Sequence, residues 1–160
     1  MARKAGIFIT GLVVGALLMG VFVYLALPGM MFKVHRSNLD FESTVTSIEN
    51  AADSYKWKVP KVYDIQASLI SAGNTGMTRL KVVSLCQPHY SYSLLQRDEH
   101  KFISGIMPCR AAVYETTDGG VYISELNTGR LGSLFGGDVA AVMETISGEH
   151  ERMFSHLYAE

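Results

Sequence analysis

Residues 6–27 form an uncharged run, GIFITGLVVGALLMGVFVYLAL, which constrains the chain more than any other feature. A helix rises about 1.5 Å per residue, so a run of this length crosses a hydrocarbon layer of roughly 30 Å. Backbone groups inside a bilayer must form their hydrogen bonds within the segment, which favours a helix. Pro28 and Gly29 then end it. We therefore predict one transmembrane helix within an N-terminal membrane anchor, residues 1–31.

A cleaved signal peptide is the alternative interpretation of this run. Signal peptides carry a shorter apolar region of about 7–15 residues, followed by a small-x-small cleavage site. The best cut, after Ala26, would place bulky Tyr24 at the −3 position. No cysteine follows the run directly, which excludes a bacterial lipoprotein. We expect the anchor to be retained.

Charged residues beside the run predict its orientation. Arg3, Lys4 and the amino terminus precede the run, whereas Lys33 and Arg36 follow it. Positively charged flanks tend to stay in the cytoplasm. The segment before the run is short, which also favours a cytoplasmic N-terminus. We expect a single-pass protein of the cell membrane whose C-terminal domain faces the periplasm or the cell exterior.

Glycine spacing within the run indicates a helix contact. Gly11 and Gly15 form a GxxxG motif, in which the absence of side chains lets two helices approach closely. Glycine is also common in membrane helices without such a role. Gly11 and Gly15 are therefore candidate helix-packing residues.

The remainder, residues 32–160, has the length of one ordinary domain. The chain carries a formal net charge of −1. A nucleic-acid-binding protein would show a basic stripe, so we expect no nucleic-acid partner.

The hydrophobic pattern of this domain changes between the two-residue period of strands and the 3.6-residue period of helices. Asn38 or Asp40 is suited to cap the first helix. The expected strands cover residues 30–37, 62–71, 80–86, 106–116 and 121–126, and the expected helices cover residues 41–58, 89–99 and 137–157. Residues 129–137 are glycine-rich without a phosphate-binding spacing, and we expect a loop before the last helix.

This order, βαββ(α)ββα, predicts an α+β fold. Asp118 and Gly119 supply the backbone conformation of a tight hairpin between the last two strands. Adjacent hairpins make the sheet mostly antiparallel, with helices packed on one face.

Two cysteines and their neighbours form the one cluster with metal-ligand chemistry. Cys86 and His89 have the spacing Cys-x-x-His, and a neighbouring strand brings Cys109 and Met107 close. Thiolate and imidazole suit zinc or copper, and a thioether suits Cu(I); haem is a further candidate cofactor. A Cys86–Cys109 disulfide would need Cα atoms about 4.4–6.8 Å apart, which paired strands provide. Two buried core thiols are the third interpretation, and these alternatives stay open.

The rest of the sequence contains no motif that indicates a particular reaction. The sequence contains no GxSxG, HExxH or CxxCH, so it lacks the signatures of serine hydrolases, zinc proteases and covalently bound haem. His150 and His156 lie six residues apart on the last helix, and we expect both on its solvated surface. We predict no catalytic residue.

Three short motifs in this order resemble a known family. They are Asp-Ile-Gln at residues 64–66, Cys-x-Pro at 86–88 and Met-Pro-Cys at 107–109. Together with the order of elements, they are similar to the domain of unknown function 302 (DUF302) family over residues 32–158. The resemblance implies a TBP-like α+β fold and a tendency to dimerise, and it implies no established activity.

The chain departs from that family pattern at its membrane anchor, at His89 and at Arg110, so the resemblance assigns these features no role. Two classes of function follow. The first is an accessory or interaction domain, as a homodimer or as a single-pass subunit of a membrane protein complex. The second is a module that binds a small ligand, a metal or a redox partner through Cys86, His89 and Cys109. We expect no cofactor for the first class, whereas copper, zinc or haem would belong to the second.

Overall fold

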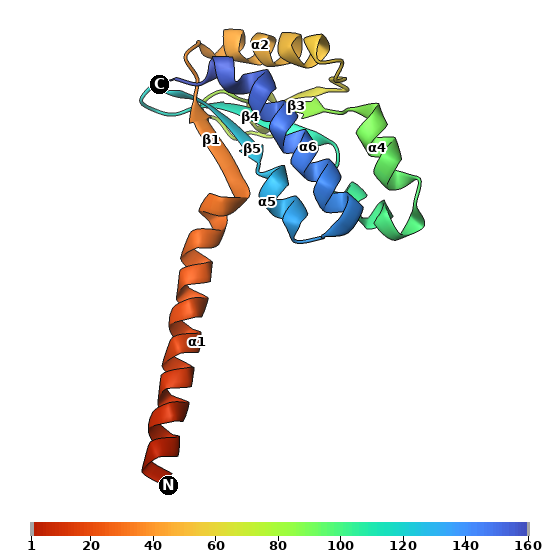
Figure 1. Cartoon of the computed structure of the whole chain (residues 1–160). Coiled ribbons are helices and arrows are strands. Elements are labelled where there is room, and N and C mark those ends of the chain that lie inside the picture. The colour runs from red at the N-terminus through yellow and green to blue at the C-terminus, as the bar shows by residue number, and fades with distance from the viewer. Residues whose placement is uncertain (1, 160) are drawn as a thin grey trace.

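The computed structural model describes the backbone of residues 2–159, and the side chains of residues 11–159 apart from Pro28. A long helix, α1 (Ala2–Met31), projects from the rest of the molecule and leads directly into β1 (Phe32–Arg36) (Figure 1). The helix continues past Pro28 and Gly29, where we expected it to end. A proline removes one backbone hydrogen bond, and the last helical turn still forms beyond it.

The predicted membrane span lies within α1, but its first part, residues 6–10, falls outside the described side chains. Among the described residues, no helix combines the length and the mean hydropathy expected of a membrane span.

Five strands form one sheet in the order β1–β5–β4–β3–β2. After β1 they are β2 (Val62–Asp64), β3 (Leu80–Leu85), β4 (Cys109–Glu115) and β5 (Val121–Leu126). All neighbouring strands run antiparallel, with Val83 opposite Ala111 and Val113 opposite Ile123 at the centre. The prediction of an α+β fold with an antiparallel sheet is confirmed.

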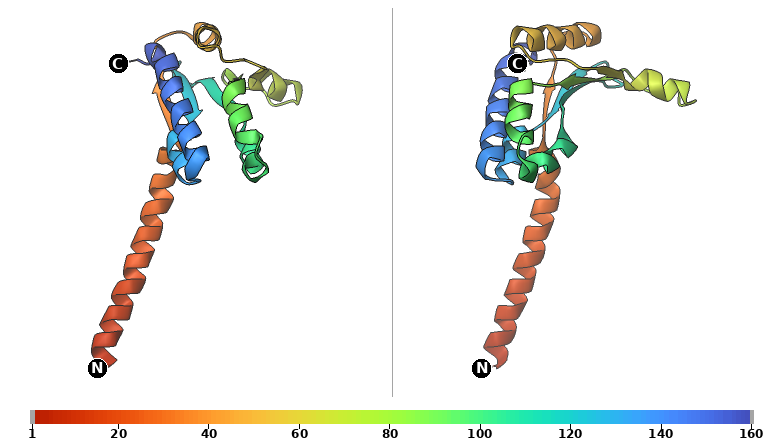
Figure 2. Two further views of the ribbon diagram at one scale, coloured as in Figure 1. Left: turned by 45° about the vertical axis from the view of Figure 1, so that its right-hand side comes forward. Right: turned by 90° about the vertical axis from the view of Figure 1, so that its right-hand side faces the viewer.

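Two long helices cover one face of this sheet. They are α2 (Phe41–Ser54), which Asp40 caps by accepting a hydrogen bond from the Ser43 backbone N–H, and α6 (Gly137–Phe154). Figure 2 shows α6 and α4 (Pro88–Leu95) together on one side of the strands. The shorter helices are α3 (Ile65–Ser71), α5 (Thr128–Ser133) and the 3₁₀ turns η1 (Asp98–Ile106) and η2 (Ser155–Leu157).

The main core lies between these helices and the covered face of the sheet. Its buried members include Phe41 and Ile48 of α2, Ala111 and Ile123 of the sheet, and Phe154 of α6. A second apolar cluster joins α4, η1 and α6 through Leu94, Ile103, Val139 and Met143. Both clusters border the cavity described below.

Two segments differ from the expected elements. Residues 62–71, expected as one strand, divide into β2 and α3, because the Asp64 carboxylate caps a helix by accepting from the Ala67 backbone N–H at 2.7 Å. Residues 129–137, expected as a loop, contribute to α5, which Asn127 caps in the same way through Arg130. A short helix without an apolar stripe leaves no periodic signal in the sequence.

Two element boundaries also differ. The helix expected at residues 89–99 divides into α4 and η1, and η1 takes in the first residue of the strand expected at 106–116. The break falls at Arg97, whose extended backbone separates the two. The Asp118-Gly119 turn forms as expected, with Gly119 at a positive φ of 81°.

The second face of the sheet carries apolar and aromatic side chains that remain partly open. Phe32 and Val34 of β1 are 51% and 50% exposed. The rings of Tyr114 and Tyr122 stack on neighbouring strands, with centroids 5.5 Å apart. The alternation in β1 therefore places Lys33 and His35, and not Phe32 and Val34, on the helix-covered side, where Lys33 reaches Glu151 at 3.1 Å.

Candidate functional site

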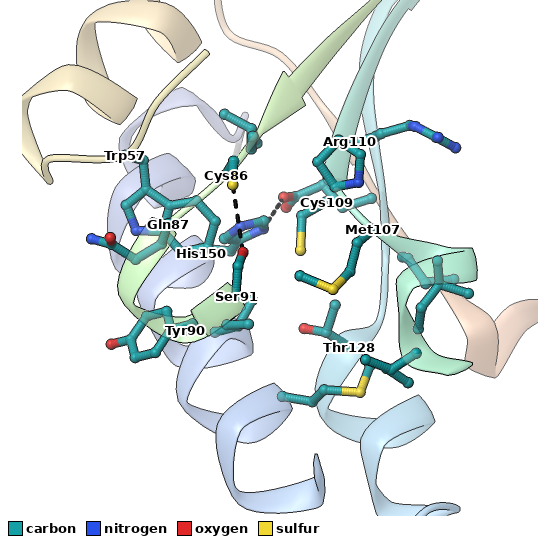
Figure 3. Close-up of a pocket in the computed structure, with 18 of the residues that line it drawn as sticks. Trp57, Cys86, Gln87, Tyr90, Ser91, Met107, Cys109, Arg110, Thr128 and His150 are labelled. Carbon is teal, nitrogen blue, oxygen red and sulfur yellow. Dashed lines mark hydrogen bonds and ion pairs between the residues drawn. The ribbon is translucent and has the colours of Figure 1, made fainter. Parts of the chain in front are cut away.

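A cavity of about 400 Å³ lies at the end of the sheet where β3 leaves and β4 enters. Cys86, Met107 and Cys109 all line it, and their sulfur atoms point toward a common space in Figure 3. His89 does not line it. The structure thus brings together three of the four residues that the sequence singled out.

Backbone pairing explains where the two cysteines lie. Cys109 opens β4 opposite Leu85, the last residue of β3. Cys86 lies one residue beyond the end of β3. Its backbone N–H donates to the Lys58 C=O at 2.9 Å, and its C=O accepts from the Lys58 N–H at 2.8 Å. The cysteines therefore sit on adjacent segments without facing each other directly.

Both cysteines are free thiols in the structure. Cys86 Sγ lies 3.5 Å from the Ser91 hydroxyl oxygen, one of the dashed contacts in Figure 3. Burial raises the pKa of the Cys109 thiol to about 12, and the nearby charges of Glu125 and Cys86 act in the same direction. Cys109 is consequently held as a protonated, weakly nucleophilic thiol.

His89 lies on the exposed side of α4, in its first turn, where its ring contacts Tyr90. Within the described part of the chain, no three His, Cys, Asp or Glu side chains come close enough to hold a metal ion. Zinc, copper and haem at Cys86, His89, Cys109 and Met107 stay predictions.

His150 is the residue that sequence reasoning placed wrongly. We expected it on the solvated surface of the last helix, but it is 5% exposed and lines the cavity. It follows Ile146 by four residues and precedes Met153 by three, so it lies on the apolar stripe of α6, and that spacing was the signal for its burial.

The two imidazole nitrogens of His150 have different surroundings. Nδ1 lies 2.7 Å from Oε1 of Glu125, whose side chain is also buried, at 4% exposed. Nε2 is buried and hydrogen-bonds to no atom of the residues that the structure describes. Glu125 could also have been found, because it continues the inward alternation of Val121 and Ile123 along β5.

A second carboxylate positions the neighbouring aromatic wall. Glu149 accepts hydrogen bonds from Trp57 Nε1 at 2.8 Å and from the Tyr90 hydroxyl at 2.6 Å. The bond to Glu149 and burial both raise the pKa of Tyr90. Trp57 in turn meets the His150 ring edge-on, with centroids 4.8 Å apart. The cavity therefore has a rigid aromatic and imidazole side.

Comparison with known proteins assigns the domain. The family model for "Domain of unknown function DUF302" matches residues 32–157. The chain belongs to the DUF302 family. The matched range contains every residue that lines the cavity.

The fold of this DUF302 domain also occurs in a solved structure. That structure is a crystal structure of an uncharacterised conserved DUF302 protein from Bacillus stearothermophilus, with a TM-score of 0.71 and 16% sequence identity. The alignment covers 80% of the present chain and 98% of the other. At 16% identity, this similarity establishes that the two proteins share a fold. Among curated proteins, no similar sequence was found.

The raised pKa of Cys109 predicts slow alkylation. A pKa of about 12 leaves on the order of one thiol in 10,000 as the reactive thiolate at pH 8. In a Cys86→Ser variant, iodoacetamide should therefore modify Cys109 at least about 100-fold more slowly in the native protein than in urea. Mass spectrometry over time measures both rates, and a Cys109→Ser variant follows Cys86 alone. Equal native and unfolded rates at Cys109 would contradict the predicted protection.

Proposed function

We propose that the chain is a single-pass membrane protein whose DUF302 domain acts as an accessory or interaction domain on the periplasmic or outer side. The observation that carries this proposal is the uncharged run at residues 6–27, which lies wholly within α1. A bilayer would accommodate such a helix without any change in its backbone hydrogen bonding.

The surface of α1 supports this placement. Apolar side chains stand exposed around the described part of the helix, with Tyr24 at 78% and Leu25 at 71%. Exposing apolar surface to water costs about 25 cal/mol per Å². A lipid environment removes this cost, whereas the domain itself covers little of the helix (Figure 1).

Two open surfaces support self-association, and we propose a second copy of this chain as the partner. A Cβ atom added at Gly11 or at Gly15 would meet nothing within 4 Å, so that face of α1 is free for a second helix. The open sheet face with Phe32 and Val34 begins directly after α1. In the anchored protein the helix face would lie within the membrane, and the open sheet face would lie next to it.

The cavity favours a second candidate function, a module that binds a small ligand. Its specific support is a buried imidazole nitrogen that finds no hydrogen-bond partner in the described part of the chain, at the wall of a cavity large enough for an organic molecule. This candidate does not depend on the anchor. In this candidate function His150 takes the role that the sequence-based hypothesis gave to His89.

The proposed topology predicts where a fused reporter is active. A reporter enzyme that folds only where disulfides form, attached after residue 160, should be active in cells that produce the full chain. The same fusion without residues 1–31 should stay in the cytoplasm and be inactive. Activity of a cytoplasm-specific reporter at the same position would reverse the topology.

Helix pairing predicts a dimer that depends on one face of α1. The full chain in mild detergent should have twice the protein mass of a monomer by light scattering. Gly11→Ile and Gly15→Ile should shift it toward the monomer, because the added side chains hold two helices apart. Gly20→Ile is the matched control: residue 20 lies nine positions from residue 11 and so, at 100° per residue, on the opposite side of the helix. A monomeric wild type, or equal effects of all three variants, would rule out this contact.

A further inference from the structure

The cavity is built to hold an apolar molecule. Its volume is about 400 Å³, within the range of small-ligand pockets. Most of its wall is apolar, and the aliphatic and thioether part includes Leu85 of β3, Leu94 of α4, Ile103 of η1 and Met143 of α6. Burial of apolar surface is thus the main source of affinity that this wall offers.

His150 supplies a polar point in that wall whose direction is fixed. An ionised Glu125 only accepts hydrogen bonds, and we infer that Nδ1 of His150 donates this one. In a neutral imidazole the other nitrogen, Nε2, then carries a lone pair and acts as an acceptor. Because Nε2 has no partner among the described residues, it is left to accept a hydrogen bond from a molecule in the cavity.

The charge of the site limits the ligand further. Glu125 is almost fully buried, so its negative charge is weakly screened. A second negative charge beside it would be repelled, and an apolar wall solvates no charged group. Arg110 also lines the cavity, but it is exposed and its side chain points away from His150 in Figure 3. We infer that the site selects a neutral molecule.

We propose that this cavity binds a small, neutral, mainly apolar molecule whose single hydroxyl group donates a hydrogen bond to Nε2 of His150. The proposal rests on the second candidate function, the ligand-binding module, and names its ligand class. Nε2 is covered in the structure, so binding requires wall side chains to shift. Met107 and Met143 are suited to this, because an unbranched thioether chain adapts its shape readily.

The chain contains a built-in reporter for this site. Trp57 is its single tryptophan; it lines the cavity and touches the His150 ring. Quenching of its fluorescence therefore reports a ligand in the cavity. The probes are 2-naphthol, which is neutral and has one hydroxyl, and 2-methoxynaphthalene, which keeps the ring and the oxygen but cannot donate a hydrogen bond.

The experiment titrates the full chain in mild detergent with each probe, after correction for the measured partition into protein-free micelles. We expect both probes to quench Trp57, and 2-naphthol to bind about three- to tenfold more tightly, the effect of one hydrogen bond. In His150→Phe, which keeps an aromatic ring but removes the acceptor, the two affinities should become equal. His89→Phe, on the exposed side of α4, should keep the wild-type difference.

Each outcome decides between the proposals. Equal binding of both probes to the wild type would leave an apolar binding module and overturn the hydroxyl-specific site. If neither probe quenches Trp57, the ligand-binding module is overturned as well. An undiminished preference for 2-naphthol in His150→Phe would remove His150 from the site. If His150→Phe does not fold, the wild-type comparison of the two probes decides alone. None of these results bears on the membrane anchor.

Discussion

The hydrogen bond between His150 and Glu125 joins α6 to β5 in the interior, and the rest of the domain is arranged around it. Burying a polar group costs free energy unless it is hydrogen-bonded, so this contact favours the rotation of α6 that brings His150 to Glu125. The same rotation turns Ile146 and Phe154 toward the main core. It turns Val139 and Met143 toward α4 and η1. The cavity lies where these two apolar clusters meet, with His150 at its wall.

The parts of the fold that could be predicted from the sequence are those with one buried face. The stripe of Phe41, Val45 and Ile48 and the alternation of Val121 and Ile123 follow directly from burial on one side. The short helix α3 has no buried residue, so it left no periodic pattern, and only the cap at Asp64 marks it. In β1 the alternation was visible, but the sequence could not say which side the helices would cover.

The candidate site was predictable in part. Cys86 and Cys109 were recognised because cysteines at the ends of neighbouring strands must lie near each other, and the structure places both at the cavity. His89 was chosen for its spacing from Cys86, but the first turn of α4 directs it outward. His150 and Glu125 were missed because each is a polar residue on an otherwise apolar pattern. A polar residue at a position where its own helix or strand otherwise has buried apolar residues indicates a buried polar contact.

The proposed acceptor at Nε2 requires that Glu125 fix the proton of His150 on Nδ1. Two-bond ¹H–¹⁵N correlation spectra of the ¹⁵N-labelled protein at neutral pH distinguish the two neutral tautomers, and the His150→Phe variant identifies the resonances. We predict a protonated Nδ1 and an unprotonated Nε2 for His150 in the protein without added ligand. A protonated Nε2 would contradict it, because the cavity would then present a hydrogen-bond donor where we infer an acceptor.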